Sequence, residues 1–208
     1  MWIKFCNAFT KITAWPLQRL CFRTRARYED AAVQKRKIKG PAIIVCNHTS
    51  IYDYAVLLFV FFSRTLRCQM AELLFRKPVL GPYLRAMGGI LVDRNAHDFG
   101  FVAKSEKILR RGGVVCIFPE GRLPREGEAR PLPFAPSAAF LALSSDVQVI
   151  PVYTDGRYFS DAPATVVIGK PFYARELAPA GKSDRETIDE GTKKMRARVI
   201  ALGEKCHD

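Results

Sequence analysis

Apolar residues follow two spacings along this chain, one suited to strands and the other to helices. From Gly40-Pro41 onward, short apolar runs bounded by turn residues alternate with longer stretches in which apolar positions recur every three or four residues. Such runs are typical of buried strands, and such stretches are typical of amphipathic helices. We predict strands over 41–46, 66–70, 89–92, 114–118, 147–153 and 164–169. We predict helices over 51–62, 73–87, 98–111, 135–144 and 183–202, and this alternation indicates an α/β fold.

The first 28 residues have a helical pattern of their own. Four large apolar residues lie three or four positions apart and share one helical face: Trp2, Phe5, Phe9 and Ile12. Pro16 interrupts this pattern, and an arginine-rich stretch follows it. We predict a basic amphipathic helical segment over 1–28 and a separate domain over 29–208. The apolar face either lies in a membrane interface or packs on the protein's own core, and the pattern alone favours neither.

Composition and charge narrow the range of partners. The chain has 208 residues, of which 49% are apolar, so we predict one folded domain and not a disordered chain. There are 33 Lys and Arg against 20 Asp and Glu, a formal net charge of +13, and residues 1–40 alone hold +8. This concentration implies an anionic partner, which is either a membrane surface or nucleic acid. No RNA- or DNA-binding motif accompanies the arginines, so the anionic membrane surface is favoured and no nucleic acid is expected.

The cysteines indicate the redox state of the protein's compartment, and the length of the apolar stretches indicates whether a transmembrane helix is expected. Six cysteines are scattered along the chain without a CxxC pair. This spacing fits neither a disulfide framework nor a zinc site, so we predict a reducing compartment and no metal. The longest apolar stretch without a charge, 54–62, is far shorter than the roughly 20 residues that span a bilayer. We therefore predict attachment to the cytoplasmic face of a membrane without a transmembrane helix.

His48 is the best candidate for a general base among the three histidines. His97 lies in a polar turn and His207 in a terminal tail, where solvated surface residues are expected. His48 directly follows the strand predicted over 41–46, and open α/β sheets bind ligands at the carboxyl ends of their strands. Because a neutral imidazole accepts protons near neutral pH, we predict a catalytic role for His48.

Asp53, five residues after His48, is the candidate partner of its ring. Within one regular helix this step would place the two side chains far apart around the axis. They meet only if His48 is in a loop and Asp53 is in the first helical turn. The sequence Ser50-x-x-Asp53 also matches a capping box, in which Asp53 would only accept a backbone N–H. Both interpretations are open at this point.

Two further predicted strands end in charged residues. Arg94 ends the segment GGILVDR, and Glu120, Gly121 and Arg122 end the segment VVCIFPEGR. Singly, Arg94 fits a surface salt bridge with Asp93, and the Glu120-Gly121 pair fits an ordinary turn. Taken together, the three strand ends supply a base with its carboxylate, a cation, and an acid–glycine–cation group. This combination favours one common site.

At these positions the chain resembles the lysophosphatidic acid acyltransferase family, the PlsC-like glycerolipid acyltransferases. The family's NHxxxxD block is matched at 47–53, and its second block, which ends in Arg, is matched at 88–94. The third block, commonly FPEGTR, is matched in part at 118–121, and the fourth, an apolar strand with a central proline, at 149–152. The four blocks agree with the family in order and spacing.

The resemblance implies an acyltransferase domain over 29–208 with a mixed, largely parallel sheet flanked by helices. It implies acyl transfer from a thioester, either acyl-CoA or acyl-carrier protein, to the free hydroxyl of 1-acyl-glycerol-3-phosphate, without a cofactor. His48 would be the general base, and Asp53 would orient its ring. Backbone N–H groups near 49–52 would assist at the developing oxyanion. The residues implied to bind the acceptor are Asn47, Arg94, Glu120, Gly121 and Arg122.

The third block departs from the family's pattern, because Arg122-Leu123 stands where Thr-Arg is common. The basic residue of this block is thus shifted by one position. The shift leaves His48 and Asp53 unchanged but affects which acceptor we expect. A lyso-aminolipid or another lysophospholipid is therefore an alternative acceptor for the same chemistry. Outside the enzymes, the alternative is a non-catalytic protein that binds lipid or nucleic acid through its basic N-terminus.

Overall fold

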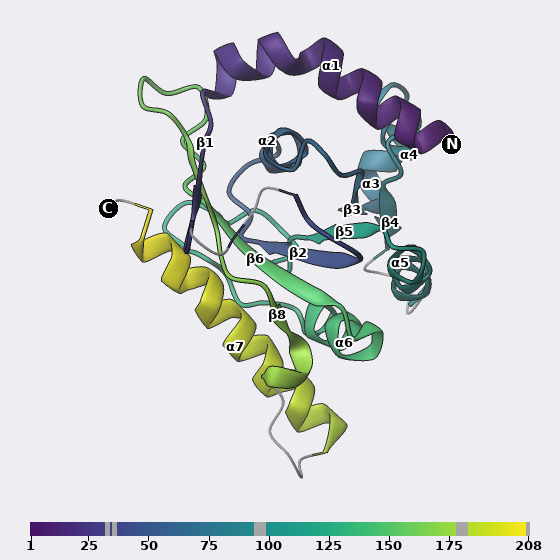
Figure 1. The fold of residues 1–208 in the computed structure, drawn as a ribbon, viewed down its shortest axis with the longest axis vertical. Coiled ribbons are helices and arrows are strands. Elements are labelled where there is room, and N and C mark those ends of the chain that lie inside the picture. The colour runs from purple at the N-terminus through teal and green to yellow at the C-terminus, as the bar shows by residue number, and fades with distance from the viewer. Residues whose placement is uncertain (32–33, 35–36, 94–98, 178–182, 207–208) are drawn as a thin grey trace.

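One sheet forms the centre of the computed structural model, which describes residues 1–31, 34, 37–93, 99–177 and 183–206 (Figure 1). Within these residues the sheet has eight strands in the order β1-β7-β6-β2-β5-β3-β4, with β8 paired to β6. Neighbouring strands are parallel except where β6 pairs with β7 and with β8. The predicted mixed, largely parallel sheet is confirmed. The strands are β1 (Arg25–Tyr28), β2 (Ala42–Cys46), β3 (Leu66–Ala71), β4 (Ile90–Val92), β5 (Val114–Ile117), β6 (Gln148–Thr154), β7 (Thr165–Ile168) and β8 (Phe172–Tyr173).

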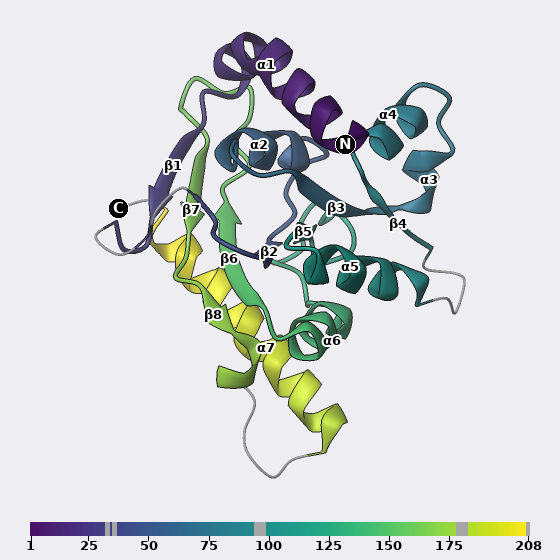
Figure 2. The ribbon, with the colours of Figure 1, turned by 45° about the vertical axis from the view of Figure 1, so that its right-hand side comes forward.

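Helices cover both faces of the sheet, with α1 and α2 on one side and α5, α6 and α7 on the other (Figures 1 and 2). Alternate residues of β2 supply the two cores: Ile43 and Val45 pack toward α5, α6 and α7, and Ile44 packs toward α2. This alternation follows from the two-residue period of a strand. The helices of the described residues are α1 (Trp2–Phe22), α2 (Asp53–Val60), α3 (Glu72–Phe75), α4 (Leu80–Ala86), α5 (Gly100–Arg110), α6 (Pro136–Ser145) and α7 (Asp184–Glu204), with a 3-10 turn, η1 (Ala174–Glu176).

The N-terminal helix α1 buries its polar face and exposes its apolar one. Asn7, Lys11 and Gln18 are buried, and the Lys11 ammonium donates to the carbonyls of Phe62 (3.0 Å) and Arg64 (2.6 Å) at the end of α2. The large apolar residues of α1 stay exposed: Trp2, Phe5, Phe9, Ile12, Trp15, Leu17 and Leu20. The interpretation in which the apolar face packs on the protein's own core is therefore wrong. No helix within the described residues combines the length and apolar character that crossing a bilayer requires.

The structure corrects two expected boundaries in the N-terminal 28 residues. The helix continues through Pro16, which lies on the exposed side, whereas Lys11 and Gln18 hold the opposite side to the protein. The helix ends where Arg23 adopts a left-handed backbone conformation (φ 44°). Residues 25–28, predicted as helical, form β1, which pairs in parallel with β7 at the edge of the sheet.

The helix predicted over 73–87 is divided into α3 and α4 around Pro78, because proline disfavours helical backbone in the residue before it.

The order of the strands places a switch point between β2 and β5. The chain leaves β2 through α2 toward β3, on one side, and leaves β5 through α6 toward β6, on the other. Neighbouring parallel strands whose connections depart in opposite directions leave a crevice at their carboxyl ends, where open α/β sheets bind ligands. His48 follows β2 and Glu120 follows β5, so both residues lie at this switch point.

Candidate active site

His48 and Asp53 form a hydrogen-bonded pair in the loop that joins β2 to α2. Nδ1 of His48 lies 2.8 Å from Oδ2 of Asp53. Asp53 is the first residue of α2 and is fully buried, whereas the side chain of His48 is 22% exposed. The pair therefore has one anchored member and one that solvent and substrate can reach. The bond to Nδ1 leaves Nε2 as the nitrogen of His48 that is available to a substrate hydroxyl.

The carboxylate of Asp53 also organises the loop around it. Oδ2 accepts backbone N–H bonds from Thr49 (2.7 Å) and Ser50 (2.9 Å), and Oδ1 accepts the Thr49 hydroxyl at 2.9 Å. The capping and catalytic interpretations of Asp53 are thus not alternatives, since one carboxylate holds both the loop and the imidazole. Of the N–H groups near 49–52 that were expected to serve an oxyanion, those of Thr49 and Ser50 are instead directed to Asp53.

Glu120 ties His48 to the end of β5. Its Oε1 accepts the backbone N–H of His48 (2.7 Å), and its Oε2 accepts that of Leu132 (2.8 Å). Burial raises the pKa of Glu120, and the two backbone bonds oppose that rise. Phe118 stacks on the His48 ring with centroids 4.5 Å apart. Gly121 follows in a turn with φ 71°, a left-handed conformation that favours glycine.

The remaining residues predicted to bind the acceptor are placed differently from one another. Asn47 is buried, and its side-chain amide both donates to and accepts from the backbone of Thr154, at 2.9 and 2.8 Å. Asn47 therefore joins the ends of β2 and β6. Arg122 is exposed and makes a two-pronged ion pair with Glu128, at 2.6 and 2.7 Å. Arg94 lies outside the described residues.

Tyr158, which no sequence motif indicated, contacts the His48–Asp53 pair through Asp53. It lies in the loop after β6, and its hydroxyl is 2.7 Å from Oδ1 of Asp53 and 2.9 Å from the Thr154 hydroxyl. Gly156 brings this loop against the loop between β2 and α2, because a Cβ there would lie 2.5 Å from the Thr49 hydroxyl. Burial raises the pKa of Tyr158 well above its usual value. The one sequence signal is its position shortly after the block at 149–152.

No group of three or more His, Cys, Asp or Glu side chains is arranged to hold a metal ion within the described residues. A partly exposed imidazole, oriented by a buried carboxylate, is suited to take a proton from a hydroxyl and return it to a leaving group. No side-chain nucleophile is needed when the attacking group is the substrate's own hydroxyl.

The chain is similar in sequence to known proteins. Human 1-acyl-sn-glycerol-3-phosphate acyltransferase beta is 27% identical over 169 residues, which cover 76% of this chain and 60% of the human protein. The 1-acyl-sn-glycerol-3-phosphate acyltransferase of Borreliella burgdorferi is 30% identical over 125 residues, or 58% of this chain and 49% of that protein. The chain thus spans about half to three fifths of the length of these relatives.

A solved structure shares the fold. The crystal structure of the 1-acyl-sn-glycerophosphate acyltransferase PlsC from Thermotoga maritima matches with a TM-score of 0.63 at 22% identity, over 97% of this chain and 78% of that one. A family model described as Acyltransferase matches residues 25–155, which is more than half of the chain and contains His48, Asp53 and Glu120. On this match, the protein belongs to the Acyltransferase family.

Proposed function

We propose that the protein transfers an acyl group from a thioester, acyl-CoA or acyl-carrier protein, to the free hydroxyl of 1-acyl-glycerol-3-phosphate, giving phosphatidic acid. The observation that carries this proposal is the His48–Asp53 pair at the switch point of the sheet. The membership in the Acyltransferase family supports the reaction type. The names of the human and Borreliella relatives support the choice of acceptor.

In the proposed reaction, Nε2 of His48 accepts the proton of the acceptor hydroxyl as its oxygen attacks the thioester carbonyl carbon. The C–O bond forms, and the carbonyl becomes a tetrahedral oxyanion. The oxyanion then collapses, the C–S bond breaks, and the thiolate leaves with the proton that His48 returns. Asp53 accepts from Nδ1 throughout, so it holds the ring in one tautomer and stabilises the transient imidazolium. The products are the ester and the free thiol.

For the acceptor's phosphate we propose the cations of the second and third blocks, Arg94 and Arg122, together with the turn at Glu120 and Gly121. An arginine fork matches the oxygens of a phosphate. Glu120 supports the site by fixing the backbone of His48, and Asn47 supports it by joining two strand ends. Arg122 would have to exchange its ion pair with Glu128 for one with the phosphate.

The ion pair between Arg122 and Glu128 is the observation that favours the alternative acceptor, another lyso-lipid. With both prongs of Arg122 on Glu128, a lyso-lipid without a phosphomonoester would need no rearrangement of this loop. A panel of acceptors offered to the purified protein in detergent, with acyl-CoA and acyl-carrier protein as donors, tests the two possibilities. We expect the fastest transfer to 1-acyl-glycerol-3-phosphate. Faster transfer to a lyso-aminolipid would reject this acceptor while leaving the chemistry intact.

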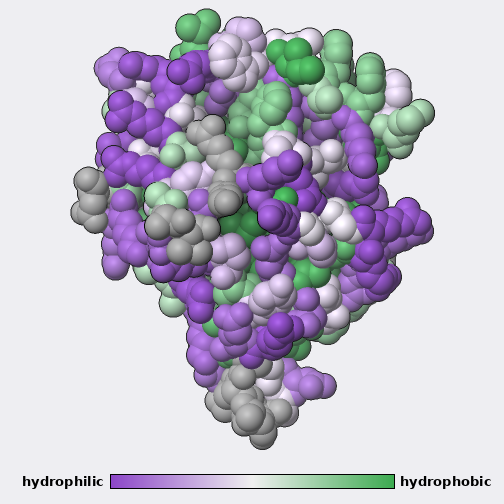
Figure 3. Space-filling view, in the orientation of Figure 1, coloured by the Kyte–Doolittle hydropathy of each residue, from purple (hydrophilic) through white to green (hydrophobic). Residues whose placement is uncertain are grey.

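We further propose that α1 lies in the interface of a membrane. Its exposed large apolar residues lie away from the protein, and its buried residues are the polar Asn7, Lys11 and Gln18, the reverse of a helix on a core. Hydrophobic side chains gather along the edge of the molecule formed by α1 (Figure 3). An interfacial helix buries such side chains among headgroups and acyl chains. Residues 1–28 contain no acidic side chain, which suits an anionic surface.

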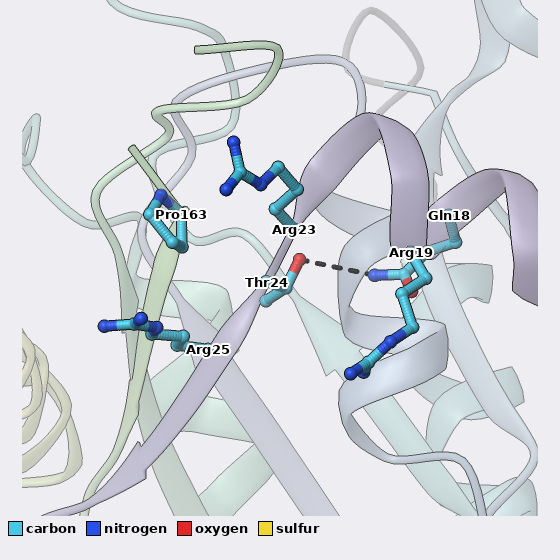
Figure 4. A pocket seen from close by; sticks show the side chains of 6 residues that line it. All are labelled: Gln18, Arg19, Arg23, Thr24, Arg25 and Pro163. Atoms are coloured by element: carbon cyan, nitrogen blue, oxygen red, sulfur yellow. Dashed lines mark hydrogen bonds between the residues drawn. The ribbon is translucent and has the colours of Figure 1, made fainter. Parts of the chain in front are cut away.

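Arginines at and just after the end of α1 also support the proposal that this helix lies in a membrane interface. Arg19, Arg23 and Arg25 surround a hollow of about 290 Å³ beside Pro163. Their side chains point in different directions around it (Figure 4). This arrangement suits contacts to several lipid headgroups more than a grip on one phosphate. All six cysteines are free thiols in the structure, which supports the cytoplasmic face of the membrane.

A further inference from the structure

Tyr158 connects three elements of the protein at one hydroxyl group. Its ring lies against α1, its loop follows β6, and its hydroxyl reaches the first residue of α2, Asp53. We propose that Tyr158 is a positioning residue, which holds the Asp53 carboxylate in the orientation that its bond to His48 requires. The kinetic part of this inference rests on the proposed function, and its spectroscopic part does not.

The hydrogen bonds at Tyr158 have a defined direction. An ionised carboxylate can only accept, so the Tyr158 hydroxyl donates to Oδ1 of Asp53. The oxygen of the Tyr158 hydroxyl can then accept a hydrogen bond from the Thr154 hydroxyl. The oxygen of the Thr154 hydroxyl in turn accepts the backbone N–H of Gly156 at 3.3 Å. Donors in such a chain polarise one another and strengthen the last bond. The chain runs from the backbone of the loop to the carboxylate, so the position of Asp53 depends on it.

Aromatic packing fixes the ring that carries this hydroxyl. Phe22, the last residue of α1, meets the Tyr158 ring edge-on, with centroids 5.5 Å apart and planes at 88°. Phe22 also contacts Tyr52 and Phe159, at 5.7 and 5.0 Å. Edge-to-face pairs of this kind hold both rings in place. The end of the exposed apolar helix is thereby packed against a residue that bonds to the catalytic carboxylate.

The other titratable groups near the His48–Asp53 pair do not replace the Tyr158 hydroxyl as a hydrogen-bond donor to Asp53. Cys46 and Cys68 interact electrostatically with Asp53, and burial raises the pKa of both thiols, so they stay neutral. Glu120 is an acceptor that is already bonded to two backbone N–H groups. Thr49 supplies the other hydroxyl to Oδ1. Removal of the Tyr158 hydroxyl would therefore leave Thr49 as the hydroxyl donor at this oxygen.

This assignment predicts a change in the hydrogen bond between His48 and Asp53. Without the Tyr158 hydroxyl, the Asp53 carboxylate loses one of the donors that fix its orientation, so its bond to Nδ1 of His48 is less well aligned. The NMR resonance of the bonded Nδ1–H proton reports this bond directly, and the rate falls with it because the base is less well oriented. A tyrosine that served only packing would change stability and leave both quantities unchanged.

The test compares Tyr158→Phe, which keeps the ring, with Tyr54→Phe as the matched control. Tyr54 is the next residue after Asp53, but its hydroxyl donates to the carbonyl of Leu66 at 3.1 Å, away from the pair. In Tyr158→Phe we expect the Nδ1–H resonance of His48, followed by NMR of labelled imidazoles, to move from its wild-type position, with kcat about three- to tenfold lower. The chain has three histidines, so His48→Ala assigns the signal. The control should match the wild type in both.

Thr154→Val, which removes the hydroxyl that donates to Tyr158, should move the same resonance and carries the test if Tyr158→Phe does not fold. An Nδ1–H resonance of His48 unchanged from the wild type in the folded variant would overturn the proposal. Should the wild type transfer no acyl group to any lyso-lipid acceptor, the proposed function fails. The NMR measurement still decides the role of Tyr158 in that case.

Discussion

Nδ1 of His48 and Oδ2 of Asp53 lie 2.8 Å apart, although five residues of chain separate them. A regular helix would turn by roughly 500° over this step and place the two side chains on different faces. The pair forms because α2 begins only at Asp53, so His48 stays in the loop. The loop is closed by the same carboxylate, through the N–H groups of Thr49 and Ser50. The geometry of the His48–Asp53 pair and that of the loop therefore depend on one side chain.

Asp53→Asn should impair activity and stability together. An amide offers one acceptor oxygen where the carboxylate offers two, and its NH2 group would face the donors that surround it. We expect kcat to fall about 10²- to 10⁴-fold, since His48 loses the partner that sets its tautomer. The loss of backbone acceptors should lower the free energy of unfolding by about 1 to 3 kcal/mol. Steady-state kinetics and urea unfolding measure the two effects, and wild-type kcat in this variant would contradict the assignment.

Glu120→Gln tests the link between the ends of β2 and β5. Glutamine can accept from only one of the two N–H groups, His48 or Leu132, that Glu120 now bonds. We expect the free energy of unfolding to fall by about 1 to 3 kcal/mol, because one buried donor is left without a partner. Glu128→Gln is the control, since Glu128 belongs to the same loop region but is 31% exposed and bonds to no described residue of β2 or its loop. Equal losses in the two variants would show that Glu120 has no special structural role.

Much of the fold could be predicted from the sequence, because continuous apolar runs mark buried strands. The run at β2 is fully buried, as its composition predicts. β1 was missed because it is a four-residue edge strand with Arg25 and Arg27, and its pairing with β7 comes from distant residues. β8 was missed because it has only two residues. Contacts across the sheet, not local patterns, define these two strands.

The candidate site shows the same division. His48 and Asp53 could be predicted because their spacing and position after a strand are local features. Tyr158 could not, since its bond to Asp53 joins positions 105 residues apart and depends on how two loops meet. Glu120 follows a strand, as its segment predicts, but its bond to the His48 backbone depends on the register of β2 with β5. Tertiary contacts therefore supplied what the motifs lacked.

Lys11 gives a pH dependence of stability that can be measured in alkaline buffers. Carbonyls of the α2 end favour its ammonium, but burial dominates and lowers its pKa from 10.5 to about 8. Between these two values the unfolded chain binds more protons at this residue than the folded one. The contribution of Lys11 to the free energy of unfolding therefore rises with pH from about 8 to about 10.5.

Lys11→Met removes this titration. The difference in unfolding free energy between wild type and variant should change across that window, by no more than about 3 kcal/mol. Urea unfolding of both proteins at intervals from pH 7.5 to 10.5 measures it. Parallel curves for the two proteins would show that Lys11 keeps its ordinary pKa.

Substitution of Phe9 tests whether the apolar face of α1 binds membranes. Phe9 is 58% exposed, and Phe9→Ser should weaken binding to anionic vesicles about tenfold, as less apolar area enters the interface. Phe140→Ser is the matched control, since Phe140 is 44% exposed on α6, across the sheet from α1. Vesicle co-sedimentation compares them. The same loss of binding in both variants would reject α1 as the membrane-binding element.

The initial rate of acyl transfer from acyl-CoA to 1-acyl-glycerol-3-phosphate, measured for wild type and for His48→Ala in the same detergent, tests the central claim. Circular dichroism and the melting temperature confirm that the variant is folded. With the base removed, and with it the imidazole that protonates the thiolate, we expect the rate to fall by about 10³-fold or more. Transfer by folded His48→Ala at the wild-type rate would contradict the account.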